Sequence, residues 1–290
     1  MVKNLKIIHS VRNEKIRTYV KLSSNSRERE KTGLFTFEGV KLAKEAASSV
    51  EVVSVFVTRE CLENYREPLA EVLERCDDVC LINQIGADKL TVNKQPQGVF
   101  VIACKGIVCD NNGGIAEKLV SAQNTKSASG RNIYVLLNEI ADPGNLGTII
   151  RGADAFGLDG VILSAGCCDV YNYKAIRASM GSVFRMPIYA EKDIPSFLKK
   201  MAEAKINTYA AVVDKNPPAA GSEAAEDYKF TPPCILCLGS EADGLPERIT
   251  SLCSRRVTIG MKGKAQSLNA AAAAHILMWR MSNGLLYATD

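Results

Sequence analysis

A strand–helix–strand pattern in the middle of the chain constrains its fold more than any other feature. The apolar run IYVLLNEI (133–140) is followed by the helical pattern LGTIIRGADAFG (146–157) and by a second apolar run, GVILSAG (160–166). Two strands joined by a helix lie parallel in one sheet, because the helix carries the chain back to the end at which the first strand began. The 290 residues suffice for about two domains. We therefore predict an α/β protein with a parallel sheet in its C-terminal part.

The first hundred residues alternate short strand and helix patterns, which predict a smaller α/β domain. The strand patterns are LFTFEG, VEVVSVFVT, VCLIN and GVFVIAC, and the helical patterns are VKLAKEAASS and EPLAEVLERC. Apolar spacing over 2–22 predicts an amphipathic helix, which the polar run 23–33 is expected to end. Segments rich in Asn, Ser and Gly surround one weak helix in 105–130, as in a linker. The predicted domains are 1–104 and 131–290.

Basic residues are concentrated near the N-terminus. Residues 1–50 hold eleven Lys and Arg against five Glu, a net +6, whereas the whole chain carries +4. Neutralisation of phosphates by basic side chains supplies most of the non-specific affinity of proteins for nucleic acids. We therefore predict an anionic macromolecular partner at this end of the protein. Candidate contacts are Arg17, Lys21, Arg27 and Lys31, for each of which a solvated surface position is an equally good explanation.

Cysteine and histidine usage argues against metal and disulfide chemistry. The ten cysteines are scattered along a chain of ordinary composition, which is typical of reduced thiols in the cytoplasm. Cys234 and Cys237 have CxxC spacing, but they lie in an apolar strand pattern, in which positions three apart face opposite ways. His9 and His275 are the only histidines, so an HExxH zinc site cannot form. We expect both histidines to be structural and no metal to be bound.

Membrane insertion and secretion are not expected from the sequence. The most apolar stretch, 268–279, is short and interrupted by polar residues, which favours a buried helix over a membrane span. The N-terminus lacks the uninterrupted apolar segment of a secretory signal. We therefore predict a cytoplasmic protein without membrane partners.

Polar residues and glycines follow three of the strand patterns in the C-terminal part. Asn145 follows the first strand, Glu241 follows the strand CILCL, and Ser267 and Asn269 follow the strand RRVTIG. Ligands of parallel α/β sheets bind at the carboxyl ends of the strands. The three loops are therefore candidates for the walls of one pocket.

Arg151 is a candidate for binding an anion near this pocket. Its helix has an apolar stripe that leaves Arg151 on another face; the stripe consists of Leu146, Ile149, Ile150 and Ala153. We place Arg151 in the first turns of this helix, where the helix dipole disfavours a merely structural cation. The chain contains no Gly-x-Gly and no GxxxxGK[ST] sequence, which argues against a nucleotide-dependent dehydrogenase and a phosphate-binding loop of that type.

The motifs and their order closely resemble the SpoU-type, or TrmH-like, RNA 2'-O-ribose methyltransferases of the SPOUT superfamily. The resemblance rests on NLGTIIRGADAFG, KAIRASMGSVFRMP, LGSEADGL and IGMKGKAQSLNAAAAAHIL. More weakly, FTFEGVKLAKEA and PQGVFVIA resemble the small ribosomal-protein-like domain with which many rRNA-modifying members bind RNA. One departure is Gly260, which stands where the family commonly has Pro.

The resemblance implies the fold, the cofactor and the oligomeric state. It implies a small N-terminal ribosomal-protein-like α/β domain and a C-terminal SPOUT α/β domain with a deep trefoil knot. S-adenosylmethionine would bind in a bent form inside the knot loops, and the protein would be a homodimer through the C-terminal domain. The implied cofactor-binding residues are Leu238, Gly239, Ile259, Met261 and Leu268.

The resemblance also implies roles in methyl transfer to a ribose 2'-OH. Arg151 would fix the adjacent phosphate and stabilise the developing alkoxide, because a guanidinium hardly deprotonates and so makes a poor base. Asn145 would orient Arg151 or the ribose, Ser267 and Asn269 would contact the nucleotide, and Glu241 would brace its loop. The implied substrate is rRNA; a tRNA 2'-O-methyltransferase and a non-catalytic RNA-binding or ribosome-assembly factor are the alternatives.

Overall fold

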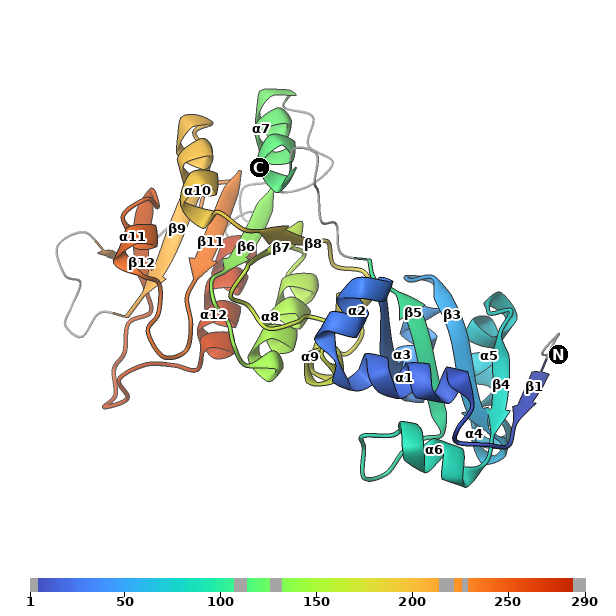
Figure 1. Ribbon diagram of the computed structural model, residues 1–290. Helices are drawn as coiled ribbons and strands as arrows, with labels where there is room; N and C mark the ends of the chain where they lie inside the picture. The colour runs from blue at the N-terminus through green and yellow to red at the C-terminus, as the bar shows by residue number, and fades with distance from the viewer. Residues whose placement is uncertain (1–4, 107–113, 126–131, 214–221, 226–228, 284–290) are drawn as a thin grey trace. The chain divides into compact units, whose positions relative to one another are not determined.

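The computed structural model describes residues 5–106, 114–125, 132–213, 222–225 and 229–283. Contacts divide the chain into two compact units, each of which is built around its own sheet (Figure 1). Unit 1 comprises Met1–Gly106 and Asp169–Arg185, and unit 2 comprises Ile107–Cys168 and Met186–Asp290. The predicted linker 105–130 lies partly outside the described residues, and most of its described part forms helix α7 (Gly114–Thr125).

Unit 1 contains a five-stranded mixed sheet. The strands, in spatial order, are β1 (Leu5–Ile8), β4 (Val79–Ile82), β3 (Val52–Thr58), β5 (Val99–Cys104) and β2 (Leu34–Glu38). Strands β1, β4 and β3 are parallel, whereas β5 is antiparallel to both β3 and β2. The helices are α1 (Glu14–Ser24), α2 (Ser26–Thr32), α3 (Val40–Ala46), α4 (Arg59–Asn64), α5 (Arg66–Arg75), α6 (Gln84–Leu90) and α9 (Tyr173–Ser179), with a 3-10 turn at Ser182–Phe184.

One apolar cluster in the core of unit 1 forms where α1 and α6 meet the sheet. Tyr19 of α1 makes edge-to-face contacts with Phe56 of β3 and Phe100 of β5, at centroid distances of 6.0 and 5.9 Å. Its hydroxyl donates to the carbonyl oxygen of Phe37 at 3.1 Å, so the polar atom is satisfied in the buried site. This packing fixes α1 against the sheet.

The N-terminal helix prediction is wrong at its start and incomplete after its end. The helix begins only at Glu14, where the Asn13 side chain accepts from the backbone N–H of Lys15, and the preceding Leu5–Ile8 forms β1 beside β4. The polar run 23–33 ends α1 at Ser24, as predicted, but it then forms a second helix, α2, that the sequence pattern does not predict. Asn25 caps α2 through its side chain, and Gly33, at φ 68°, ends it. Hydrophobic periodicity reports neither pairing with a distant strand nor capping of a polar helix.

The segment Asp169–Arg185 packs within unit 1, although it is far along the chain. Arg29 is 4% exposed and pairs with Asp169 at 2.7 Å. The rings of Phe35 and Tyr171 lie 4.4 Å apart between centroids. An aromatic contact and a partly buried ion pair thus fasten the segment to β2 and α2.

Unit 2 contains a seven-stranded sheet in which every strand pair is parallel, as predicted. The strands, in spatial order, are β10 (Ser222–Ala224), β12 (Arg255–Thr258), β9 (Asn207–Val212), β11 (Cys234–Leu238), β6 (Ile133–Leu137), β7 (Gly160–Ser164) and β8 (Ile188–Glu191). Besides α7, the helices are α8 (Pro143–Ala155), α10 (Ile194–Glu203), α11 (Glu247–Thr250) and α12 (Ala270–Asn283).

Helices α8 and α12 pack closely against each other in unit 2 (Figure 1). His275 of α12 lies against Gly152 of α8 and bonds through Nε2 to the carbonyl oxygen of Thr148 at 3.0 Å. A β-carbon on Gly152 would come within 2.1 Å of the His275 ring. His275 therefore has a packing role, in agreement with the sequence prediction.

The cysteines of β11 are buried in the sheet. Burial raises the pKa of Cys234 to about 12, and a hydrogen bond with Cys253 together with burial raises the pKa of Cys237. Thiols held in the protonated form are poor metal ligands.

Within the described ranges, no helix is long and apolar enough to cross a membrane. The same ranges contain no group of three His, Cys, Asp or Glu side chains that could hold a metal ion.

Candidate active site

The candidate site begins where β6 and β11 end side by side. Leu137 of β6 is in register with Leu238 of β11, and the backbone N–H of Asn138 donates to the carbonyl oxygen of Leu238 at 2.8 Å. The chain continues from β6 to β7 on one side, whereas β11 lies on the other side. Crevices of parallel sheets form at such a change of direction. The loops after β6 and β11 therefore start beside each other.

The loop after β6 places Asn145 in the first turn of α8. Asp142 caps this helix by accepting from the backbone N–H of Asn145 at 2.7 Å, and Pro143 occupies the first helical position. The Asn145 side chain donates from Nδ2 to Oε1 of Glu241, in the loop after β11, at 2.8 Å.

The residues before the last helix join the same network. Asn269 Oδ1 accepts from the backbone N–H groups of Ala271 and Ala272 at 2.9 and 3.3 Å, which caps α12. Asn269 Nδ2 donates to Asn145 Oδ1 at 3.0 Å. The Asn145 amide is thus bonded at both ends, and the three predicted motif loops meet at this side chain.

The loop after β11 folds tightly on itself. Ser240 and Gly244 form an isolated bridge, and Gly244 has a φ of 67°, which favours glycine. A β-carbon on Gly239 would lie 2.0 Å from the carbonyl carbon of Gly244. Glycine is therefore required at position 239 for the backbone to approach this closely.

Arg151 lies on α8, outside the hydrogen-bonded network. The apolar stripe of its helix is fully buried, as predicted, while Arg151 is exposed. The placement in the first turns is wrong, because α8 begins at Pro143 and Arg151 is in its third turn. The dipole argument for Arg151 therefore no longer applies. Neither Arg151 nor the exposed Ser267 makes a side-chain hydrogen bond to the part of the chain that the structure describes.

The predicted cofactor-binding residues lie in two segments of unit 2. One segment is the end of β11, and the other is the loop between β12 and α12. Leu238 is buried and Gly239 is half-buried at the end of β11. Ile259 and Met261 are half-buried directly after β12, and Leu268 is exposed just before α12.

Asn138 is a polar residue that the sequence reasoning missed. It is 3% exposed, and its Nδ2 atom has no hydrogen-bond partner among the described residues. Buried amide groups without partners are costly, so this donor is available for a polar ligand at the end of β6. The signal in the sequence is a polar residue that directly follows an apolar strand.

Some basic side chains of the N-terminal part are exposed to solvent, and others form ion pairs within unit 1. The four predicted contacts, Arg17, Lys21, Arg27 and Lys31, are all exposed on α1 and α2. By contrast, Lys6 and Lys15 bind Asp78, and Arg29 is buried against Asp169. Part of the positive charge is thus neutralised within unit 1.

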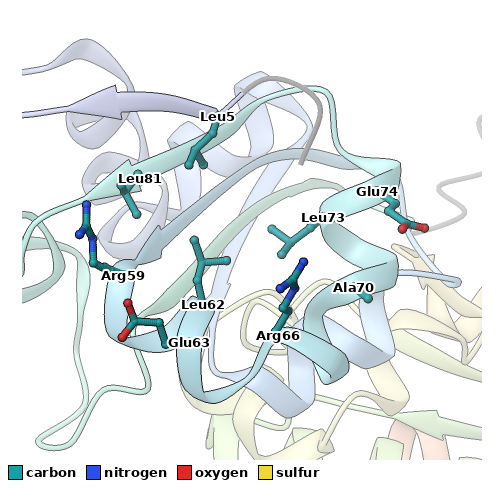
Figure 2. A pocket seen from close by; sticks show the side chains of 9 residues that line it. All are labelled: Leu5, Arg59, Leu62, Glu63, Arg66, Ala70, Leu73, Glu74 and Leu81. Atoms are coloured by element: carbon teal, nitrogen blue, oxygen red, sulfur yellow. The ribbon is translucent and has the colours of Figure 1, made fainter. Parts of the chain in front are cut away.

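Unit 1 also has a hollow of about 840 Å³ over β1, α4 and α5 (Figure 2). Leu5, Leu62 and Leu73 contribute apolar surface, and Arg59 and Arg66 line it beside acidic residues. None of the predicted site residues lines this hollow. It is therefore separate from the candidate active site.

Comparison with known proteins matches both parts of the chain. Residues 132–279 match the model of the SpoU rRNA methylase family, and residues 13–101 match the MRM3-like substrate binding domain. The chain is 28% identical to the 23S rRNA (guanosine(2553)-2'-O)-methyltransferase RlmP of Bacillus subtilis, over 96% of this chain and 99% of that protein.

Two solved structures have similar folds. The AdoMet-bound rRNA methyltransferase of Sinorhizobium meliloti has a TM-score of 0.78 at 26% identity, over 99% of each chain. The SpoU methyltransferase AviRb of Streptomyces viridochromogenes, in complex with AdoMet, has a TM-score of 0.77 at 26% identity, over 95% of this chain and 99% of that one.

Proposed function

Because this chain belongs to the SpoU rRNA methylase family, we propose that it is an S-adenosylmethionine-dependent methyltransferase acting on a ribose 2'-OH of rRNA. The main observation in support of the proposal is that the three motif loops meet at the side-chain amide of Asn145, which forms hydrogen bonds with both Glu241 and Asn269. Full-length similarity to an enzyme named as a 23S rRNA 2'-O-methyltransferase favours rRNA over tRNA as the substrate.

The cofactor would bind in the loops after β11 and β12. The residues proposed to hold it are Leu238, Gly239, Ile259, Met261 and Leu268. The close approach required at Gly239 and the unpaired donor of Asn138 suit a polar ligand that is held largely by backbone groups. When bound, S-adenosylmethionine supplies a methyl group on a sulfonium. The similar fold of the AdoMet-bound rRNA methyltransferase of Sinorhizobium meliloti supports this assignment.

The residues of this chain would orient the ribose and stabilise charge. Asn145, held on both sides, would present its remaining N–H to the ribose, and the bond from Asn145 supports a bracing role for Glu241. Arg151 would bind the phosphate next to the target and stabilise the oxyanion that forms as the 2'-OH loses its proton, because a guanidinium stays charged. Ser267 would contact the nucleotide from the loop before α12.

The same proposal includes a deep trefoil knot in unit 2 and a homodimer formed through it. Two large apolar side chains support a partner surface on α12: Ile276 is 41% exposed and Trp279 is 50% exposed. They lie three residues apart and so project from one side of the helix.

Unit 1 would bind RNA, as its match to a substrate binding domain suggests. The proposed cytoplasmic location is the one expected for an enzyme that acts on rRNA.

The proposal is tested by incubating the purified protein with methyl-labelled S-adenosylmethionine and an unmodified 23S rRNA transcript, followed by digestion to nucleosides. Label is expected in a 2'-O-methylnucleoside and is expected to be lost in Arg151→Ala. Arg248→Ala, which removes another exposed arginine of unit 2, is the matched control and should retain activity. Label in tRNA alone, or binding of RNA without any methyl transfer, would contradict the proposal.

A further inference from the structure

Helix α9 places two cations from the methylase region on the surface of unit 1. The segment Asp169–Arg185 lies inside the range that matches the methylase family model, yet it packs with the N-terminal domain. α9 lies against β2, and its Lys174 and Arg177 are exposed. The surface of unit 1 therefore includes residues that the match to a substrate binding domain, 13–101, does not cover.

Arg177 is held in place by neutral groups. Its Nη1 atom donates to Asn93 Oδ1 at 2.8 Å and to the Tyr173 hydroxyl at 3.3 Å, and Tyr173 also donates to Asn93. Arg177 makes no ion pair with any described carboxylate. Arg29 and Arg185 of the same unit are different, since they pair with Asp169 and Glu45. Arg177 thus has a fixed orientation and touches no carboxylate directly, although the buried Glu38 behind Asn93 is close enough for the charge of Arg177 to act against the rise in the pKa of Glu38 that burial causes.

The orientation of Asn93 is set by a buried carboxylate. Glu38 is 6% exposed, and its Oε1 atom accepts from Asn93 Nδ2 and from the backbone N–H of Val92. An ionised carboxylate only accepts hydrogen bonds, so the NH₂ end of the Asn93 amide must face Glu38 and its oxygen must face Arg177. Glu38 is therefore a positioning residue that acts on Arg177 through Asn93.

We infer that Arg177, flanked by Lys174 and Lys94, binds a backbone phosphate of the RNA substrate at this end of unit 1. The inference deepens the proposed function and rests on it. A guanidinium has five donors in a planar fork that matches a phosphate, and Nη1 is the atom engaged by Asn93 and Tyr173. Lys94 and Lys174 are both exposed. Because Arg177 is already oriented, little side-chain freedom is lost when an anion binds.

The first test measures RNA binding by the full-length protein with an unmodified 23S rRNA transcript, between about 50 and 200 mM salt. Arg177→Gln is expected to weaken binding about tenfold, as for one charge-assisted hydrogen bond. It should also reduce the slope of log affinity against log salt by about 0.9, the value for one lost phosphate contact. Arg75→Gln is the matched control, because Arg75 is exposed in unit 1 but pairs with Glu71.

The second test separates RNA binding from a purely structural role of the network. In the double variant Glu38→Gln, Asn93→Asp, the amide introduced at position 38 can donate to the new carboxylate in place of the bond between Asn93 and Glu38, so that the carboxylate neutralises Arg177 without removing it. Phosphate binding predicts a loss of RNA affinity in this variant, whereas a role limited to anchoring α9 predicts that affinity is kept. Glu38→Gln retains the acceptor oxygen for Asn93 and should bind RNA nearly as the wild type does; Glu38→Ala should not.

Thermal unfolding and S-adenosylmethionine binding are measured for every variant, so that misfolding is recognised. An Arg177→Gln protein that binds the transcript within about twofold of wild type, with an unchanged salt slope, overturns this inference and leaves the methyltransferase proposal intact. A wild-type protein that neither binds nor methylates the transcript overturns both. If Arg177→Gln increases the KM for RNA and leaves the affinity for S-adenosylmethionine unchanged, both the inference and the methyltransferase proposal are supported.

Discussion

Asn145 donates a hydrogen bond from Nδ2 to Oε1 of Glu241 over 2.8 Å, although 96 positions separate the two residues in the chain. The contact exists because β6 and β11 are neighbours, so that the loops after them begin at the same end of the sheet. Asn269 completes the arrangement from the start of α12. The Asn145 amide is thereby fixed before any substrate arrives, which is the condition for an orienting group.

Replacement of Glu241 should distinguish bracing from charge. Glu241→Ala removes the acceptor for Asn145 and should lower kcat/KM for methyl transfer about tenfold, the effect of one hydrogen bond of about 1.4 kcal/mol. Glu241→Gln retains an acceptor oxygen and should keep most of the activity. Steady-state kinetics with the rRNA transcript provide the measurement.

Glu203→Ala is the control for Glu241, since Glu203 is an exposed glutamate of unit 2 on α10. Its activity should equal that of wild type. If Glu241→Gln were as impaired as Glu241→Ala, the negative charge would be required and the bracing role would be wrong.

Gly239→Ala should disrupt the loop after β11. The added β-carbon would lie 2.0 Å from the Gly244 carbonyl carbon, and because both groups belong to the backbone the loop must move. We expect a loss of about 1–3 kcal/mol of folding free energy and weaker S-adenosylmethionine binding. Urea unfolding and calorimetric titration with the cofactor measure the two effects.

Gly263→Ala serves as the matched control, because a β-carbon at Gly263 meets no atom within 4 Å. It lies in the loop between β12 and α12, so it tests whether any methyl group added near the proposed cofactor site is harmful. Equal losses in the two variants would refute the steric explanation for Gly239.

The sequence predicts where each site residue stands on its own strand but not which strands are neighbours. Asn145, Glu241 and Asn269 each follow a strand pattern. The meeting of Asn145 with Glu241 depends on the adjacency of β11 and β6, and that of Asn145 with Asn269 accompanies the packing of α12 on α8, both of which are long-range properties. The position of α9 in unit 1 is equally invisible in local periodicity. It depends on contacts such as that of Tyr171 with Phe35, 136 positions apart. The resemblance to the family implies roles for these residues, and the structure gives their hydrogen-bond partners.

Local patterns succeed where burial follows directly from periodicity. Leu146, Ile149, Ile150 and Ala153 are all fully buried, as their spacing predicts. They fail at the N-terminus, where Leu5–Ile8 is a strand because β4 is available to pair with it. The polar helix α2 is likewise missed, since it is stabilised by Asn25 at one end and Gly33 at the other rather than by an apolar stripe.

Gly152→Ala should loosen the packing of α8 on α12. The new β-carbon would lie 2.1 Å from the His275 ring, so either the ring or the helix that carries Arg151 must shift. The expected cost is about 1–3 kcal/mol of folding free energy, as for overpacking of a core. Thermal and urea unfolding give this value. The double variant Gly152→Ala, His275→Ala creates room for the methyl group and should be less destabilised than the sum of the single variants; simple additivity would show that the contact is not the cause.

Asp78 should make the stability of unit 1 depend on pH in the acid range. Burial acts to raise the pKa of Asp78, but hydrogen bonds from Lys15, Lys6 and Ser54 outweigh it and lower the pKa to about 2. Lys6 Nζ lies 2.6 Å from Oδ1, and Ser54 Oγ lies 2.8 Å from Oδ2. Because the folded protein holds Asp78 ionised more strongly than the unfolded chain does, its contribution is present above the unfolded pKa of about 3.9. It is lost as the pH falls toward 2.

Asp78→Asn should therefore lower the free energy of unfolding by about 2 kcal/mol at neutral pH. The difference from wild type should shrink as the pH is lowered through the acid range, because protonation removes the same charge from the wild-type protein. Urea unfolding of both proteins across this range gives the two curves. For Asp77→Asn, at the exposed neighbouring position, the free energy of unfolding should depend on pH in the same way as for wild type. A constant gap between Asp78→Asn and wild type would show that lost hydrogen bonding, rather than the charge of Asp78, stabilises the contact between β4 and the N-terminal lysines.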